Sequence, residues 1–278
     1  MRAWLYLLRV ALISLVLPVV TAIGQPAEAP FKVGVAPHTS ARVILEQYRP
    51  LRLHLEKELG RRVEILTATD FTEFVRQALA QSFDLVITTG HQARLLQKDA
   101  HYDPLLTYLA DFKSLIIVAA KGKIRSPGDL KGTTVIGLSS TSLVTLWGEH
   151  WLKRQGLGDV PVRYVSAADS VAQLVLRGEG SAGLISLPNL QKLSPELQAD
   201  LRVLAESAPM AGRVYLLNGR NRKLLPQIDK ALWSFAASEP GKEYFRLNQL
   251  IGYRKLRRGE LDAMDSYANE VRRNLESR

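Results

Sequence analysis

The chain has 278 residues, 46% of them hydrophobic, and a formal net charge of +10. This length suits one large domain or two of moderate size. The absence of cysteine excludes disulfides, zinc–thiolate sites and thiol catalysis. The five histidines are scattered without metal-ligand spacing, so we expect no metal site.

The basic residues are spread along the chain, with the densest groups at 61–62, 220–223 and 254–258. No zinc-finger, RNP-like or basic-zipper pattern accompanies them, so we predict no nucleic-acid binding. A G-x-G-x-x-G run occurs at 178–183. A predicted helix precedes it and a predicted strand follows, which is the reverse of a dinucleotide fingerprint. We therefore expect no cofactor.

Residues 1–24 are typical of an export signal. Arg2 and Arg9 precede a mostly apolar run of 14 uncharged residues from Val10 to Ile23, with small residues suited to cleavage after Ala22. The run is shorter than the roughly 20 residues of a membrane span. We predict a signal peptide at 1–22 and a periplasmic mature chain of charge +8. An uncleaved membrane anchor is the alternative.

After a short linker, apolar runs of strand type alternate with segments of helical periodicity. We expect strands at 31–37, 61–69 and 83–90 and helices at 41–59, 70–81 and 91–98. This alternation predicts an α/β fold with a mainly parallel sheet. Ligands bind such sheets beyond the carboxyl ends of the strands. That rule selects three hydroxyl-rich turns, at 37–40, 67–70 and 88–91.

A second α/β series follows. We expect strands at 114–121, 134–138, 160–166, 181–187 and 212–218, helices at 143–155 and 169–177, and C-terminal helices at 222–237, 240–251 and 260–275. The pattern predicts two lobes, the first comprising 31–120 plus 213–278 and the second 121–212. The chain would cross between them near 119–123 and 208–214.

Four consecutive hydroxyl residues, Ser139 to Ser142, separate a predicted strand from a helix that begins at Leu143. The first N–H groups of a helix lack partners within it and lie at its positive end. Hydroxyls beside them add donors, so this turn could hold an oxyanion without Lys or Arg. The alternative is that one of these hydroxyls merely caps the helix.

Three segments together carry a family resemblance: "VGVAPHTSARVILEQYRPLRLHLEKELG", "FDLVITTG" and "IRSPGDLKGTTVIGLSSTS". They resemble the PhnD-like phosphonate-, phosphite- and phosphate-binding periplasmic proteins of ABC transporters, over about residues 31–250. The resemblance implies a type II periplasmic binding protein whose two lobes close over an oxyanion by a hinge motion. It implies a non-enzymatic, monomeric protein whose partner is an ABC permease or a membrane sensor.

The resemblance places ligand contacts at the hydroxyl turn and in the loops of the first lobe, and the predicted cleft adds further candidates. The candidate ligand-binding residues are Thr39, Ser40, Thr69, Phe71, Thr88, His91, Tyr108, Ser139, Ser140, Thr141, Ser142 and Asp169. The chain also departs from the family pattern. Phe71 replaces a Tyr, Ala168 replaces a His, and acidic residues are missing near Ser186, which disfavours an aminoalkylphosphonate ligand.

Two other functions remain open at this level. One is a ligand-sensing module that feeds a sensor kinase. The other is a periplasmic serine hydrolase, because Gly137-Leu138-Ser139 resembles the start of a nucleophile elbow. That motif lacks its second glycine, and the only later histidine, His150, lies on the helix that follows directly.

Overall fold

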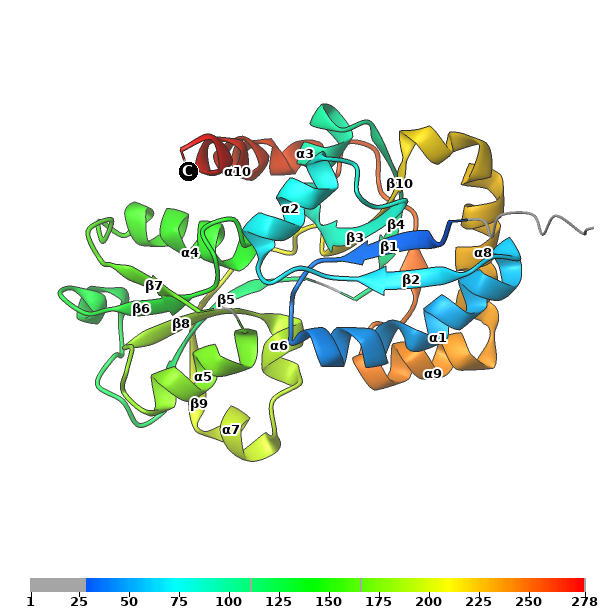
Figure 1. Cartoon of the computed structure of the whole chain (residues 1–278). Coiled ribbons are helices and arrows are strands. Elements are labelled where there is room, and N and C mark those ends of the chain that lie inside the picture. Colours follow the sequence, from blue (N-terminus) through cyan, green and yellow to red (C-terminus); the bar gives the residue numbers. More distant parts are fainter. Residues whose placement is uncertain (1–28, 111, 166, 278) are drawn as a thin grey trace, which may run out of the picture.

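The protein consists of two α/β lobes that lie side by side in the computed structural model (Figure 1). The structure describes residues 29–110, 112–165 and 167–277, so the predicted export signal lies outside the described residues. Among the described helices, none has the length and apolar character needed to cross a membrane.

The first lobe is built on a six-stranded sheet with the order β11-β4-β10-β3-β1-β2. Its strands are β1 (Phe31–Val35), β2 (Val63–Leu66), β3 (Leu85–Thr89), β4 (Tyr102–Tyr108), β10 (Arg213–Asn218) and β11 (Tyr253–Arg254). β1 pairs in parallel with β2 and β3, whereas β10 runs antiparallel to β3 and β4. β11 is also antiparallel to β4, so two of the five strand pairings in this sheet are parallel and three are antiparallel.

Helices cover both faces of this sheet. They are α1 (Ala41–Leu59), α2 (Phe71–Leu79), α3 (Gly90–Asp99), α8 (Leu225–Ala237) and α9 (Glu239–Asn248), with a 3₁₀ turn at Gly219–Leu224 before α8. Ile44, Tyr48, Leu51 and Leu55 lie on one side of α1 and are fully buried against the sheet and α8. Full burial of each such side chain contributes about 1.5–3 kcal/mol, which fixes α1 in place.

The second lobe is built on a five-stranded sheet with the order β7-β6-β8-β5-β9. Its elements are β5 (Ser114–Ala119), a 3₁₀ turn (Pro127–Leu130), β6 (Val135–Gly137), α4 (Leu143–Arg154), β7 (Val162–Tyr164), α5 (Ala168–Leu176), β8 (Ala182–Ser186), α6 (Leu187–Gln191), α7 (Pro195–Ala199) and β9 (Leu201–Glu206). β6 is parallel to β7 and β8, and β5 is antiparallel to β8 and β9.

The predicted two-lobed α/β fold is confirmed, with two differences in detail. Both sheets are mixed rather than mainly parallel, because the strands next to the chain crossings run back against the parallel ones. β5 pairs with the second sheet, although the predicted boundary at residue 120 placed it in the first lobe. The crossings therefore lie at 109–113 and 207–212. Strands β4, β9 and β11 were not expected from the sequence.

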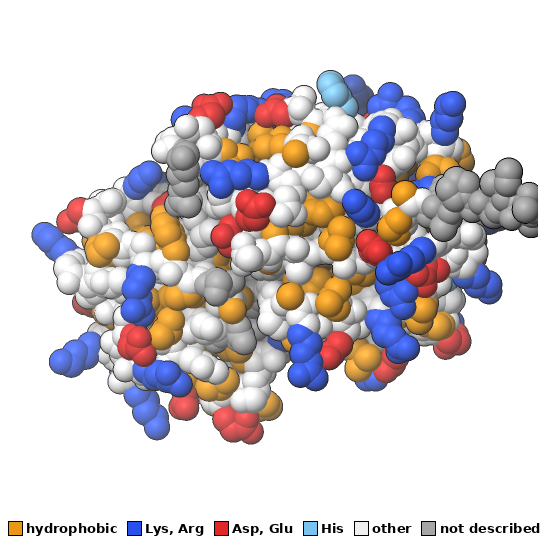
Figure 2. All heavy atoms as spheres, in the orientation of Figure 1, with side chains coloured by type: hydrophobic (Ala, Val, Ile, Leu, Met, Phe, Trp, Pro, Cys, Tyr) orange, Lys and Arg blue, Asp and Glu red, His pale blue; other side chains and the backbone are white. Residues whose placement is uncertain are grey.

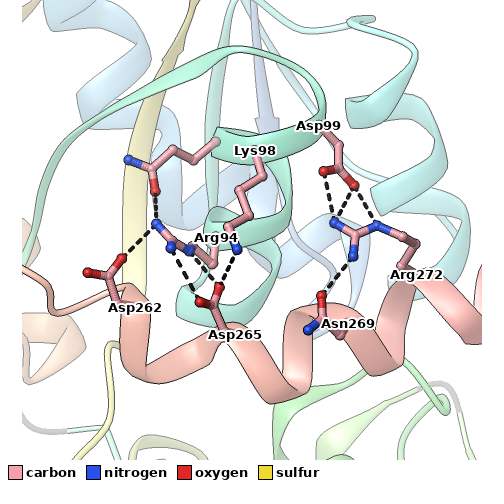
Figure 3. A network of polar contacts seen from close by, with 8 residues as sticks. Arg94, Lys98, Asp99, Asp262, Asp265, Asn269 and Arg272 are labelled. Atoms are coloured by element: carbon pink, nitrogen blue, oxygen red, sulfur yellow. Dashed lines mark hydrogen bonds and ion pairs between the residues drawn. The ribbon is translucent and has the colours of Figure 1, made fainter.

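The last helix, α10 (Asp265–Glu276), follows a short 3₁₀ turn at Asp262–Met264 and lies across the top of both lobes in Figure 1. On the first lobe it is held to α3 by ion pairs (Figure 3). Arg94 contacts Asp262 at 2.7 Å and Asp265 at 2.8 Å, and Arg272 contacts Asp99 at 2.8 Å.

The same helix also contacts the second lobe. Glu270 pairs with Nε2 of His150 on α4, and the Asn274 amide donates to the Ser140 carbonyl at 3.0 Å. Val271 belongs to a small apolar cluster that includes Leu146 of α4. Helix α10 therefore joins the two lobes on the side of the hydroxyl-rich turn.

Candidate functional site

A cavity of about 50 Å³ lies between the lobes, beside the chain crossings. One water molecule needs roughly 10–15 Å³ measured in this way, so the cavity can hold a small polyatomic ligand. From the first lobe and its crossings it is lined by His38, Phe71, Thr89, Tyr108, Ala110, Gly212, Arg213 and Leu250. From the second it is lined by Phe112, Leu138, Ser142, Leu143, Val144, Ser186, Pro188 and Asn189.

The N-terminus of α4 opens into this cavity. Ser142 is the N-cap residue, and its side chain makes no capping hydrogen bond. Leu143 and Val144 line the cavity, and N–H groups in the first turn of a helix have no partner within it. The Thr145 hydroxyl accepts a hydrogen bond from Leu138 N at 2.9 Å, which ties the strand end to the helix start. The sequence thus folds into a helix terminus whose donors remain available to an anion.

The first lobe contributes a second uncapped helix start. Thr89 is the N-cap of α3, lines the cavity and makes no side-chain capping bond. The neighbouring helix α2 differs, because Asp70 accepts hydrogen bonds from Thr72 N and Glu73 N at 2.8 and 2.9 Å. A carboxylate already occupies the positive end of α2, and Gly90 N at the start of α3 donates to the Ala211 carbonyl at 3.1 Å, so α4 offers the freer helix start at this cavity.

Arg213, the first residue of β10, brings a full positive charge to the cavity. Its Nη1 atom is buried and has no hydrogen-bond partner among the described residues. The guanidinium lies near the phenols of Tyr48, Tyr108, Tyr215 and Tyr244. Burial raises the pKa of the last three well above the usual value, so those phenols are neutral at pH 7. Among the described residues, no carboxylate forms an ion pair with Arg213.

The charge of Arg213 also affects its basic neighbours. Burial, and then the charge of Arg213, hold the pKa of His38 well below its usual value, so this imidazole is neutral. Its Nδ1–H donates to the Ala36 carbonyl at 2.9 Å. Burial, and then the charge of Arg213, also lower the pKa of Lys192 to about 8, although Lys192 does not line the cavity and donates to Asn248. The positive charge in the cavity itself comes from Arg213.

The hydroxyl of Thr141 does not line the cavity but joins the lobes. Thr141 is fully buried, and its Oγ1 lies 3.1 Å from Thr72 Oγ1 on α2 and 3.2 Å from Ser139 Oγ. Its carbonyl accepts a hydrogen bond from His91 Nε2 at 2.9 Å. Because Thr72 and His91 belong to the first lobe, these bonds hold the lobes together directly behind the cavity.

His91 is a neutral link in this interlobe contact. It is fully buried, and burial lowers its pKa to about 4 despite its hydrogen bond to the Thr141 carbonyl. Since a carbonyl can only accept, Nε2 carries the proton. Nδ1 must then accept from the Thr89 hydroxyl, which lies 3.1 Å away.

The structure divides the candidates from the sequence into three groups. Those that line the cavity are Phe71, Tyr108 and Ser142. Those in contacts between the lobes or behind the cavity are His91, Ser139, Ser140 and Thr141. Those elsewhere are Thr88, which is buried and donates to Gln92, the half-buried Thr39, and the exposed Ser40 and Thr69. Asp169 lies in α5, with its side chain outside the described part of the structure.

Sequence reasoning did not select Arg213 or Thr89. A signal for Arg213 was present, since a lone arginine opens an otherwise apolar strand just after a chain crossing. Thr89 follows the candidate Thr88 directly, and only the three-dimensional structure shows which of the two faces the cavity. Strand alternation explains the difference, because adjacent side chains point to opposite faces.

The described residues provide no cluster of His, Asp and Glu that could hold a metal ion. A serine-hydrolase arrangement is not formed either. His150 pairs with Glu270 and stacks on Tyr267, with ring centroids 5.0 Å apart, and it makes no hydrogen bond to Ser139 in the described structure.

Residues 33–260 match the family described as "ABC transporter, phosphonate, periplasmic substrate-binding protein". The chain belongs to this family. Its members are periplasmic substrate-binding components of transporters and not enzymes. The match spans most of the chain and includes both lobes, both crossings and every residue that lines the cavity.

Solved structures share the fold. XAC2383 from Xanthomonas citri, bound to chloride, is 22% identical with a TM-score of 0.74, over 88% of this chain and 99% of that one. PhnD1 from Prochlorococcus marinus, in complex with methylphosphonate, is 17% identical with a TM-score of 0.74, over 87% and 98%. The aliphatic sulphonate-binding protein SsuA from Escherichia coli is 18% identical with a TM-score of 0.54, over 91% and 84%. At these identities the likeness shows the fold and not the ligand.

Proposed function

We propose that this protein captures a small oxyanion, such as a phosphonate, phosphite or phosphate, in the cavity between its lobes and delivers it to an ABC permease. It acts as a monomer in the periplasm after removal of residues 1–22. The first lobe comprises the described residues up to 110 and from 213 onward, and the second comprises 112–206.

The observation that carries this proposal is the buried, unpartnered Nη1 of Arg213 in the same cavity as the N-terminus of α4. A buried charge costs several kcal/mol unless a partner of opposite sign reaches it. An oxyanion supplies that charge together with several acceptor atoms. It can accept hydrogen bonds from the guanidinium on one side and from the first N–H groups of α4 on the other.

The remaining lining residues narrow the class of ligand. Ser142 can donate to an oxygen or accept from a protonated one. Phe71, Leu138 and Leu250 leave an apolar wall that suits a small alkyl substituent. None of the described lining residues is a carboxylate that could hold an ammonium group. These features favour a small oxyanion without an amino group.

A ligand panel tests the proposal. The mature chain, residues 23–278, is titrated calorimetrically and followed by thermal unfolding with phosphate, phosphite, methylphosphonate, sulfate, arsenate and 2-aminoethylphosphonate. A ligand at 100 times its Kd stabilises the folded state by about 2.7 kcal/mol, so a binder raises the Tm by several degrees. We expect this rise with at least one of the first three anions and none with 2-aminoethylphosphonate. If no anion shifts the Tm at millimolar concentration, the proposal is wrong.

A further inference from the structure

The cavity between the lobes holds more positive charge than the described residues around it can neutralise. Arg213 is protonated at any physiological pH. The N-terminus of α4 adds the equivalent of roughly half a positive charge. The described residues that line the cavity include no Asp or Glu. A ligand with a single negative charge would therefore leave part of this positive charge buried without compensation.

The backbone of Arg213 holds this charge in place. The residue pairs with Thr89 in the antiparallel ladder of β10 and β3, and its carbonyl accepts from the Thr107 hydroxyl at 2.8 Å. The position is also closely packed, since a Cβ on Gly212 would lie 2.9 Å from the Phe112 side chain. The start of β10 therefore cannot swing out to solvent without breaking the ladders that pair this interior strand with β3 and β4.

The phenols around Arg213 are engaged with one another. The Tyr108 hydroxyl lies 2.7 Å from that of Tyr215 and 2.6 Å from that of Tyr244, and the Tyr253 hydroxyl donates to Tyr215 at 2.9 Å. Neutral phenols can solvate a guanidinium but cannot cancel its charge. The nearby tyrosines thus form a polar but uncharged wall, and a counter-charge must come from elsewhere.

We infer that Arg213 determines specificity for doubly charged oxyanions, so that the ligand is a phosphonate or phosphate dianion and not a monoanion such as a sulfonate. This inference rests on the proposed function. Phosphate monoesters lose their second proton near pH 6, and inorganic phosphate and alkylphosphonates lose it at roughly pH 7–8, whereas a sulfonate carries one charge at every such pH. A dianion can neutralise both Arg213 and the terminus of α4, and a monoanion of the same shape can neutralise only one of them.

Methylphosphonate and methanesulfonate test this directly, because they have nearly the same shape and differ in charge. We expect the wild-type mature chain at pH 8.5, where methylphosphonate is doubly charged, to bind methylphosphonate at least about 30-fold more tightly than methanesulfonate by calorimetry. Arg213→Gln should weaken methylphosphonate binding by at least about 30-fold, the effect of leaving one partner of a buried charge pair unmatched. The same substitution should change methanesulfonate binding by less than about threefold.

Arg213→Lys is the matched control, because it keeps the charge and alters the geometry. We expect it to retain the preference for methylphosphonate. The wild-type comparison needs no variant, so it can still overturn the inference if Arg213→Gln fails to fold. Wild-type protein that binds both ligands equally would overturn the inference while leaving oxyanion capture intact. Wild-type protein that binds none of the panel anions would instead contradict the proposed function.

The variant Asp111→Asn tests whether a carboxylate of the chain, and not the ligand, supplies the negative charge that neutralises Arg213. Asp111 follows Ala110 in the sequence and lies outside the described residues. If its carboxylate neutralised Arg213, Asp111→Asn would strengthen methylphosphonate binding tenfold or more, and the inference would fall. An affinity within threefold of the wild-type value supports a charge supplied by the ligand.

Discussion

At the scale of single residues, the four hydroxyls of the turn at 139–142 perform different tasks. Ser142 lines the cavity, Thr141 bonds to Thr72 across the lobes, and the Ser140 carbonyl accepts from Asn274 of α10. The sequence predicts a helix terminus with hydroxyl donors. It cannot show which hydroxyl points where, because that depends on the backbone torsions of the turn and on the opposite lobe.

A residue-level prediction concerns the dependence of stability on pH. The pKa of His91 is about 4 in the folded protein and about 6.5 when unfolded. Between these values the unfolded chain binds more protons, so the free energy of unfolding falls as the pH is lowered from about 6.5 to about 4. The loss should be of order 3 kcal/mol. We expect His91→Gln to remove its own share of the slope in urea unfolding measured from pH 4 to pH 7, and the share due to the buried His38 to remain.

His101→Asn is the matched control for that experiment. His101 is exposed and adopts a left-handed backbone conformation (φ 56°), which Asn tolerates. The control should keep the wild-type slope. A His91→Gln protein with the full wild-type slope would show that other groups cause it.

At the scale of elements, helix starts and local periodicity were predictable, and strand partners were not. The helix expected at 41–59 is α1, because its apolar spacing and the following Gly60 are local signals. β4 and β9 were missed, since their pairing with β10 and β5 involves residues far apart in the sequence. The position of Arg213 at the start of an apolar strand is visible in the sequence. Its place in the cavity is not, because that depends on β10 pairing with β3 and β4 and on the opposite lobe.

The start of α3 supports a prediction at this scale. Gly90 begins the helix, and a Cβ there would lie 2.6 Å from the Ala211 Cβ and 2.7 Å from the Ala211 carbonyl oxygen. Because Ala211 belongs to the chain crossing at 207–212, its backbone cannot move away from the added Cβ freely. Gly90→Ala should destabilise the protein by about 1–3 kcal/mol, and it should weaken oxyanion binding by displacing Thr89. Urea unfolding and calorimetry measure the two effects.

Gly128→Ala is the comparison for this variant. Gly128 lies in the 3₁₀ turn before β6, and the nearest atom to its added Cβ would be 3.9 Å away. Its stability should stay within about 0.5 kcal/mol of the wild-type value. A Gly90→Ala protein as stable as Gly128→Ala would show that the crossing at 207–212 adjusts without cost.

At the scale of the whole molecule, the surface gives little indication of the ligand. Lys and Arg side chains are dispersed over both lobes on the face shown in Figure 2, with Asp and Glu between them. The charge that matters is concentrated inside, at Arg213 and the start of α4. The molecule is therefore organised by the contact between its lobes, and α10 is the element that spans this contact.

The contacts of α10 with the first lobe and those with the second lobe should consequently contribute differently to ligand retention. Its ion pairs from Asp265 and Arg272 hold it on α3 of the first lobe, whereas Glu270 and Asn274 contact the second lobe. If the lobes part by a hinge motion, α10 stays with α3 and only the second pair of contacts breaks. Those contacts then favour the closed form, from which bound ligand cannot leave.

The double variant Glu270→Gln/Asn274→Ala should therefore release methylphosphonate faster. Two hydrogen bonds contribute about 1 kcal/mol each, and partial loss of this energy raises the dissociation rate by roughly 3–10-fold with little change in the association rate. Stopped-flow displacement measures both rates. Arg272→Ala, which removes only a contact to the first lobe, should leave them unchanged. Faster dissociation from Arg272→Ala, with an unchanged rate in the double variant, would mean that α10 travels with the second lobe, because the ion pairs on α3 would then be the contacts that break on opening.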